Sequence, residues 1–146
     1  MVYERFTPSA LKVIILAQEE ARRIGRNLIE TEQLLLALIE EESGFASKVL
    51  NSFGVDLTQA RLKVEQITGF GSGVAPDEVI NYSPTAEHIV VSSSEEALHL
   101  GSNSIDTEHL LLALIHAEES TAVTVLTQLG VDLKQLSTQI YNIRDE

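Results

Sequence analysis

The chain repeats itself with a fixed offset of 76 residues. Residues 7–68 align with 83–144 without a gap, and 26 of the 62 aligned positions are identical. The longest shared stretch covers 29–39 in the first copy and 105–115 in the second. Copies of one unit fold alike, and units this short gain stability by packing together. The repeat predicts two units, about 4–68 and 80–144, that form a pseudo-two-fold pair within one domain spanning 1–146.

Each unit is expected to contain four helices. In the first unit, Thr7 is placed to cap a helix whose first residue is Pro8, and Gly25 is placed to end that helix. Thr31 is predicted to cap a short second helix that is apolar on every side and therefore central. A third helix follows, and a fourth begins at Asp56. Matching residues 76 positions later predict the same order, so we expect an all-α fold of eight helices.

The segment 69–79 interrupts the pattern with three glycines and a proline. Such a composition disfavours both helix and strand. We interpret it as the connector between the units, either mobile or laid over the surface.

The charge of the chain excludes several classes of partner. Residues 1–74 carry 8 basic and 10 acidic side chains (8 − 10 = −2), and residues 75–146 carry 2 and 12 (2 − 12 = −10). Proteins that bind phosphate-rich surfaces need clustered lysine and arginine. We therefore expect neither nucleic acid nor membrane as a partner. Without a run of membrane-spanning length or a signal-peptide core, the chain is expected to be cytoplasmic.

The sequence offers little support for catalysis, a cofactor or a metal. The absence of cysteine excludes a thiolate metal site and a cysteine nucleophile. The glycine-rich segment 69–73 lacks the Gly-Lys-Ser/Thr of a phosphate loop. The four histidines lie 11, 10 and 7 residues apart, without the i, i+4 spacing of helical metal ligands, and are interpreted as surface residues: His88, His99, His109 and His116. We expect a non-catalytic domain. The alternative, a small enzyme or ligand carrier that uses paired carboxylates, would need a second functional group beside them.

Two acidic triplets stand where the second helix of each unit is expected to begin: Glu30-Thr31-Glu32 and Asp106-Thr107-Glu108. Carboxylates in a first turn stabilise a helix by about 0.3–1 kcal/mol each, which is sufficient reason for their presence. The alternative is that they line two equivalent pockets for a cationic group of another protein, because a carboxylate accepts two hydrogen bonds from a guanidinium. That hypothesis requires Thr31 and Thr107 to be accessible and the two halves to fold alike.

Several motifs together resemble the Clp N-terminal domain of ClpC-type AAA+ unfoldases. They are Arg5-Phe6-Thr7, Ala17-Gln-Glu-Glu-Ala-Arg22, Thr31-Glu32-Gln33, Lys48-Val49-Leu50 and the two Gly-Val-Asp-Leu turns. The resemblance covers essentially the whole chain and is stronger in residues 1–74. It implies an eight-helix module above an ATPase ring, which receives adaptors and clients and has no activity of its own. The ATPase modules are absent from this chain.

The resemblance also implies a ligand. Bacterial members of the family can hold phosphoarginine, and by position Glu32 and Glu108 correspond to the acidic residues that take the guanidinium. Thr31 and Thr107 correspond to the motif threonines. The motif glycine is replaced by a carboxylate, Glu30 or Asp106, which can occupy the anion site itself. Two charges about 6 Å apart repel by roughly 2–3 kcal/mol at an effective dielectric near 20. Phosphoarginine recognition is therefore expected to be weakened or lost.

The resemblance leaves the biological setting open. The chain is either the front end of a ClpC-type unfoldase or a stand-alone accessory protein, and the acidic, divergent second unit favours the second. The expected partners are a Clp unfoldase or protease core, adaptors and client polypeptides. The alternative is a structural or regulatory clamp on the Clp complex that binds no client. If the source is a plant, the expected location is the plastid stroma.

Overall fold

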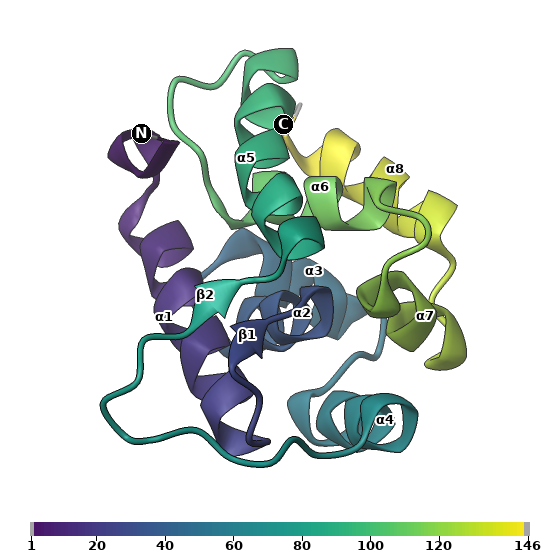
Figure 1. Ribbon diagram of the computed structural model, residues 1–146. Coiled ribbons are helices and arrows are strands. Elements are labelled where there is room, and N and C mark those ends of the chain that lie inside the picture. The colour runs from purple at the N-terminus through teal and green to yellow at the C-terminus, as the bar shows by residue number, and fades with distance from the viewer. Residues whose placement is uncertain (1, 145–146) are drawn as a thin grey trace.

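The computed structural model describes residues 2–144 and contains the eight predicted helices in two sets of four (Figure 1). The first set is α1 (Pro8–Arg23), α2 (Thr31–Glu40), α3 (Phe45–Ser52) and α4 (Leu57–Thr68). The second set is α5 (Pro84–His99), α6 (Thr107–His116), α7 (Thr121–Gln128) and α8 (Leu133–Arg144). A 3-10 turn, η1 (Val2–Arg5), and two short strands, β1 (Leu28–Ile29) and β2 (Asn81–Tyr82), complete the elements. Residues 1 and 145–146 of the predicted 1–146 domain lie outside the described residues.

The first helix of each set begins as the sequence predicts. The backbone N–H of Ala10 donates to Oγ1 of Thr7 at 3.1 Å, and that of Ala86 donates to Oγ of Ser83 at 3.2 Å. Each cap is followed by a proline at the first helical position, where no backbone N–H is needed.

The helices α2 and α6 lie at the centre of the molecule (Figure 1). Their leucines, 34–36 in α2 and 110–112 in α6, are almost completely buried. Because these helices are apolar on every side, they can only be stable when other helices surround them. The prediction that they are central is confirmed.

Each set of helices reaches across to the other through two short backbone contacts. Parallel pairing of β1 with β2 places Ile29 opposite Tyr82, and an isolated bridge places Ile105 opposite Phe6. Residues 29 and 105, and residues 6 and 82, are each 76 positions apart, so the two contacts are pseudo-two-fold equivalents. The halves of the chain are therefore joined by hydrogen bonds as well as by a shared apolar core.

The connector between α4 and β2 is laid over the end of α1, one of the two possibilities raised by its sequence (Figure 1). The N–H of Gly71 donates to the carbonyl of Ile24 at 2.8 Å, and the N–H of Gly73 donates to that of Gly25 at 2.9 Å. Gly25 has a φ of +75°, and a Cβ atom there would lie 2.9 Å from the nitrogen of Gly73. Glycine is thus required at this crossing for both conformation and space.

Within residues 2–144, no single helix is long and apolar enough to cross a membrane. The pair α6 and α7 passes such a test jointly by length and composition, but the two helices are bent by 92° at the break between them.

Candidate functional site

The two threonines of the acidic triplets are buried, contrary to the hypothesis built on their sequence. Thr31 is 4% exposed and Thr107 is 1% exposed. Oγ1 of Thr31 accepts a hydrogen bond from the N–H of Ala122, and Oγ1 of Thr107 accepts one from the N–H of Ala46, each at 3.1 Å. The expectation that these hydroxyls are accessible to a partner is therefore wrong.

The physical reason lies in the crossing of the two repeats. Ala122 is in the first turn of α7 and Ala46 in the first turn of α3, where backbone N–H groups have no partner within their own helix. A buried N–H without an acceptor costs about 1–3 kcal/mol. The hydroxyl of each threonine supplies the acceptor for such an N–H in the other repeat. The residues that cap α2 and α6 are instead Glu30 and Asp106.

The start of α2 nevertheless lines an open hollow, which we call the α2 hollow. Its volume is about 630 Å³, and its opposite wall is the loop between α6 and α7. The lining residues are Glu30, Thr31, Glu32, Thr85, His116, Ala117, Glu118, Glu119, Ser120 and Thr121. Four of these ten described residues are glutamates and none is lysine or arginine, so the hollow has the electrostatic character of a cation site.

Glu32 is the most deeply buried carboxylate that lines this hollow. It is 5% exposed, and the Thr31 hydroxyl donates a hydrogen bond to it at 3.5 Å. Among the described residues, no lysine or arginine lies within ion-pair distance of Glu32. Burial raises the pKa of Glu32, and the neighbouring charge of Glu30 raises it further, against opposing effects of its own backbone, Arg26 and Thr31. A cation entering the hollow would favour the ionised carboxylate.

The start of α6 is different, so the expectation of two equivalent accessible pockets is also wrong. Glu108 is 1% exposed. One carboxylate oxygen of Asp106 accepts hydrogen bonds from the Thr7 hydroxyl and from the N–H of Thr107, each at 2.8 Å. In the second triplet, Thr107 and Glu108 are buried and Asp106 binds the chain's own N-terminal segment, whereas the first triplet borders the α2 hollow.

Comparison with known proteins accounts for the duplicated architecture. The family model described as "Clp repeat (R) N-terminal domain" matches residues 5–90 and 81–145. The chain belongs to this Clp N-domain family. The pea chloroplastic chaperone protein ClpC is 49% identical over 145 residues, which are 99% of this chain and 16% of that protein. This Clp N-domain thus spans about a sixth of the length of that relative.

Two solved structures illustrate the fold. The N-terminal domain of ClpD from Arabidopsis thaliana matches this Clp N-domain with a TM-score of 0.84 and 25% identity, covering 100% of this chain and 98% of that one. A ClpV N-domain in complex with a VipB peptide matches with a TM-score of 0.71 and 13% identity, covering 97% and 89%. The matched regions are N-domains, so the comparisons place this chain outside the ATPase modules of Clp chaperones.

One histidine in the Clp N-domain departs from the interpretation of all four as surface residues. His109 is fully buried in the first turn of α6, and its Nδ1 accepts a hydrogen bond from the N–H of Asp106 at 2.9 Å. Gln33 performs the same task in α2, where its Oε1 accepts from the N–H of Glu30 at 2.8 Å. The imidazole therefore replaces a glutamine as part of a helix cap. No group of three or more potential metal ligands occurs in residues 2–144.

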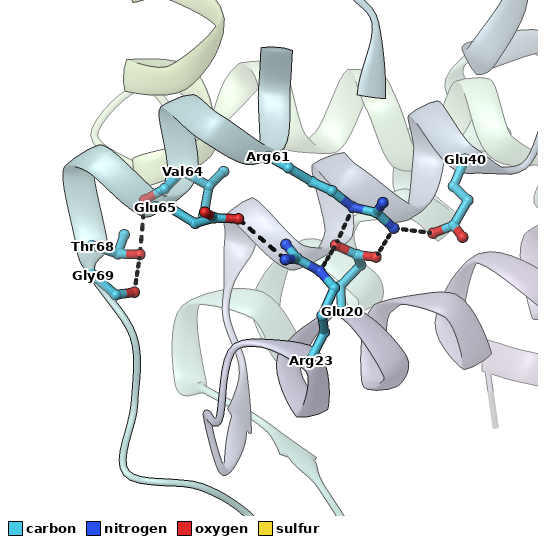
Figure 2. Close-up of polar contacts among 8 residues, drawn as sticks. All are labelled: Glu20, Arg23, Glu40, Arg61, Val64, Glu65, Thr68 and Gly69. Carbon is cyan, nitrogen blue, oxygen red and sulfur yellow. Dashed lines mark hydrogen bonds and ion pairs between the residues drawn. The ribbon is translucent and has the colours of Figure 1, made fainter. Parts of the chain in front are cut away.

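An ion-pair cluster that was not predicted from the sequence joins α1, α2 and α4 of the Clp N-domain (Figure 2). Glu20, whose side chain is 3% exposed, accepts hydrogen bonds from Arg61 at 2.6 and 3.1 Å and from Arg23 at 3.2 Å. Arg23 also pairs with Glu65 at 3.1 Å, and Arg61 lies 3.8 Å from Glu40. The signal was the position of Glu20 on the same helical stripe as buried Val13, Ala17 and Ile24.

Crowding of carboxylates in this cluster affects Glu40. Burial raises the pKa of Glu40, and the nearby charge of Glu20 acts in the same direction, while Arg61 opposes both. The cluster holds three helices of the first repeat together and lies apart from the residues that line the α2 hollow.

Proposed function

We propose that this Clp N-domain is a protein-binding module of a Clp ATP-dependent protease or chaperone system, which recruits adaptors or clients by seating a cationic side chain in the α2 hollow. The observation that carries the proposal is Glu32, a carboxylate buried in the wall of an acidic hollow, with no lysine or arginine among the described residues within ion-pair distance of it. A charge-assisted hydrogen bond from a guanidinium or ammonium group supplies such a partner.

The role of a protein-binding module is supported by the family and by the fold. The same fold is found in the ClpV N-domain that was solved with a VipB peptide. We extend peptide binding to this chain through its own chemistry, in which the sequence around the hollow favours a basic partner. Exposed Glu118 and Glu119 on the loop between α6 and α7 would attract such a partner at a distance, and salt would weaken the attraction.

The hollow is expected to discriminate against phosphoarginine. Glu30 stands at the N-cap of α2, where a helix start would otherwise favour an anion. A phosphoryl group carries close to two negative charges at neutral pH and would meet Glu30, Glu118 and Glu119. The same carboxylates attract the positive charge of an unmodified arginine or lysine. We therefore assign the unmodified cationic side chain as ligand class.

The experiment is a titration of the domain with three short peptides by calorimetry. The peptides have blocked ends and differ only at one central position, which holds arginine, citrulline or phosphoarginine. We expect the arginine peptide to bind at least tenfold more tightly than the other two. Equal binding of the arginine and citrulline peptides would refute the cation site.

A matched pair of variants locates the site. Glu32→Gln removes the buried carboxylate and is expected to weaken binding of the arginine peptide about tenfold or more, the usual scale of a lost charge-assisted contact. Glu42→Gln removes an equal charge from an exposed position that does not line the hollow and should leave binding within about twofold. A Glu32→Gln variant that binds as well as wild type would place the ligand elsewhere.

The proposed partners are a Clp unfoldase or protease core together with adaptors and clients. The relatives include chloroplastic ClpC proteins, which supports the plastid stroma as the place of action if the source is a plant. Affinity capture with a Clp unfoldase, at low and at high salt, tests the association. Capture of the unfoldase without binding of any basic peptide would favour the structural or regulatory clamp in place of the recruiter.

A further inference from the structure

The ion-pair cluster of the first repeat has a chemically different counterpart in the second. In the first repeat, Glu20 of α1 is paired with Arg61, a side chain that keeps its charge at every physiological pH. The counterpart of Glu20 is Glu96 of α5, and the counterpart of Arg61 is Ser137, which carries no charge. Glu96 is instead paired with His116, whose Nδ1 lies 2.7 Å from its Oε1. The second repeat has exchanged a permanent cation for a titratable one.

The position of His116 connects this exchange to the α2 hollow. His116 is the last residue of α6, and its side chain is 48% exposed and lines the hollow, while Glu96 behind it is 17% exposed. The corresponding residue of the first repeat is Glu40, so the imidazole also replaces a carboxylate. Among the described residues that line the hollow, His116 is the only one that can become positively charged.

The charged groups that pair with His116 or line the hollow with it are carboxylates. Glu96 of α5 pairs with His116. Tyr141 of α8 lies near Glu96: burial raises the pKa of the Tyr141 phenol, and the charge of Glu96 raises it further. Two more pairs of carboxylates line the hollow together with His116: Glu118 and Glu119 in the loop to α7, and Glu30 and Glu32 at the start of α2 on the opposite wall. Within the described part of the chain, no lysine or arginine lines the hollow to mask a change in the charge of the imidazole.

We infer that His116 acts as a pH-dependent gate on the α2 hollow. Protonation of its imidazole adds a positive charge, which lowers the affinity of the hollow for a cationic side chain. The inference rests on the proposed function, since it concerns the regulation of that same site. Histidine changes charge within the physiological range of pH. When protonated, His116 pairs with Glu96 and presents a positive charge to the ligand's cation; when neutral, it leaves the wall wholly negative.

The sign of the effect follows from the charges. One added unit charge in a partly screened surface site changes affinity by about fivefold. Binding of the arginine peptide should therefore tighten by about fivefold between pH 6.0 and pH 8.0. Protonation of Glu32, whose pKa is raised by burial, weakens binding with the same sign. The part of the slope that His116→Gln removes is therefore the measure of the gate.

Two substitutions at the same position separate these contributions. His116→Gln removes the titratable charge and should bind tightly, with a smaller slope than wild type from pH 6.0 to pH 8.0. His116→Arg fixes the charge and should bind weakly across the same range. His88→Gln, an exposed histidine outside the hollow, is the matched control and should keep the wild-type profile. The peptide is histidine-free with blocked ends, so only the protein titrates.

The outcomes distinguish the gate from the proposed function. Binding of the wild-type domain that is flat between pH 6.0 and pH 8.0, or that keeps its slope in His116→Gln, overturns the gate and leaves the cation site intact. Absence of arginine-peptide binding at every pH overturns the proposed function and the gate with it. Circular dichroism of each variant at both pH values establishes that the fold is unchanged.

Discussion

Oγ1 of Thr31 accepts a hydrogen bond from the backbone N–H of Ala122, which lies 91 residues later in the chain, at a distance of 3.1 Å. Its pseudo-two-fold equivalent joins Thr107 to Ala46 at the same distance. Each repeat therefore supplies the acceptor that the first turn of a helix in the other repeat lacks. This exchange makes the two repeats mutually dependent, because neither can complete its own helix starts alone.

Removal of one of these acceptors should destabilise the whole domain. Thr31→Val keeps the shape of the side chain and leaves the N–H of Ala122 buried without a partner. The expected loss is about 1–3 kcal/mol in the free energy of unfolding, measured by urea titration. Thr138→Val, at an exposed position of α8, makes the same chemical change and should cost less than about 0.5 kcal/mol. Equal stability of the two variants would contradict the role given to the crossed hydrogen bond.

The Glu20 cluster provides a second test of stability. Glu20→Gln leaves the guanidinium groups of Arg23 and Arg61 without their shared carboxylate (Figure 2). Both arginines keep about a third of their side chain in solvent, so we expect a loss of about 2 kcal/mol, below that of a fully buried pair. Glu65→Gln removes only the outer pair to Arg23 and should cost about 0.5 kcal/mol. Thermal and urea unfolding of both variants checks the order.

Glu32 should show a conflict between binding and stability. Because burial raises its pKa above that of the unfolded chain, its contribution to stability is fully present below about pH 4.5 and is lost as pH rises through the folded-state value. Glu32→Gln resembles the protonated side chain. The variant should therefore gain stability relative to wild type as pH rises above about 4.5, while it loses the arginine peptide. Paired urea titrations at several pH values measure the difference, and a difference independent of pH would contradict the assignment.

The connector's seat on α1 can be tested with two glycines that share a conformation. Gly25 and Gly101 occupy equivalent positions with φ of +75° and +70°. A Cβ atom at Gly25 would meet backbone atoms of the connector, whereas a Cβ atom at Gly101 would have no described atom within 4 Å. Gly101→Ala should cost about 1–2 kcal/mol from backbone strain alone. Gly25→Ala should cost at least about 1 kcal/mol more in urea unfolding, since the methyl group would overlap the backbone of Gly71 and Gly73.

A third alanine variant isolates the contact from the strain. Gly71 has no positive φ, yet a Cβ there would lie 2.1 Å from the carbonyl oxygen of Gly25. Gly71→Ala should lift the connector, which hydrogen exchange at residues 71 and 73 would report as lost protection. Unchanged protection would mean that the connector is not held by this crossing.

Local chemistry made the helices predictable. The caps at Thr7 and Ser83 depend on residues three positions away, and the all-round apolar character of α2 and α6 requires burial whatever surrounds them. The burial of Glu20 could also have been predicted, since Glu20 lies on the buried face of α1. The family resemblance rests on the same local motifs, which is why it could be stated before the tertiary structure was considered.

The site was less predictable because its openness depends on contacts between distant segments. Glu32 and Glu108 occupy identical triplet positions and are both buried, but only Glu32 lines the α2 hollow. Asp106 is engaged by Thr7, 99 residues away. No spacing within either repeat encodes these differences, so the sequence suggested two equivalent pockets where only the first triplet borders the α2 hollow.

The sequence by itself determined the duplication, the eight helices, the caps of α1 and α5 and the acidic character of the second repeat, because each depends on neighbours along the chain or on composition. Only the tertiary structure decided where the hydroxyls of Thr31 and Thr107 point and which acidic triplet borders the α2 hollow. It also decided that His116, which lines this hollow, pairs with Glu96. The reason is that a buried polar group takes whichever partner the packing of the two repeats brings to it, and that packing joins Thr7 to Asp106, 99 positions apart.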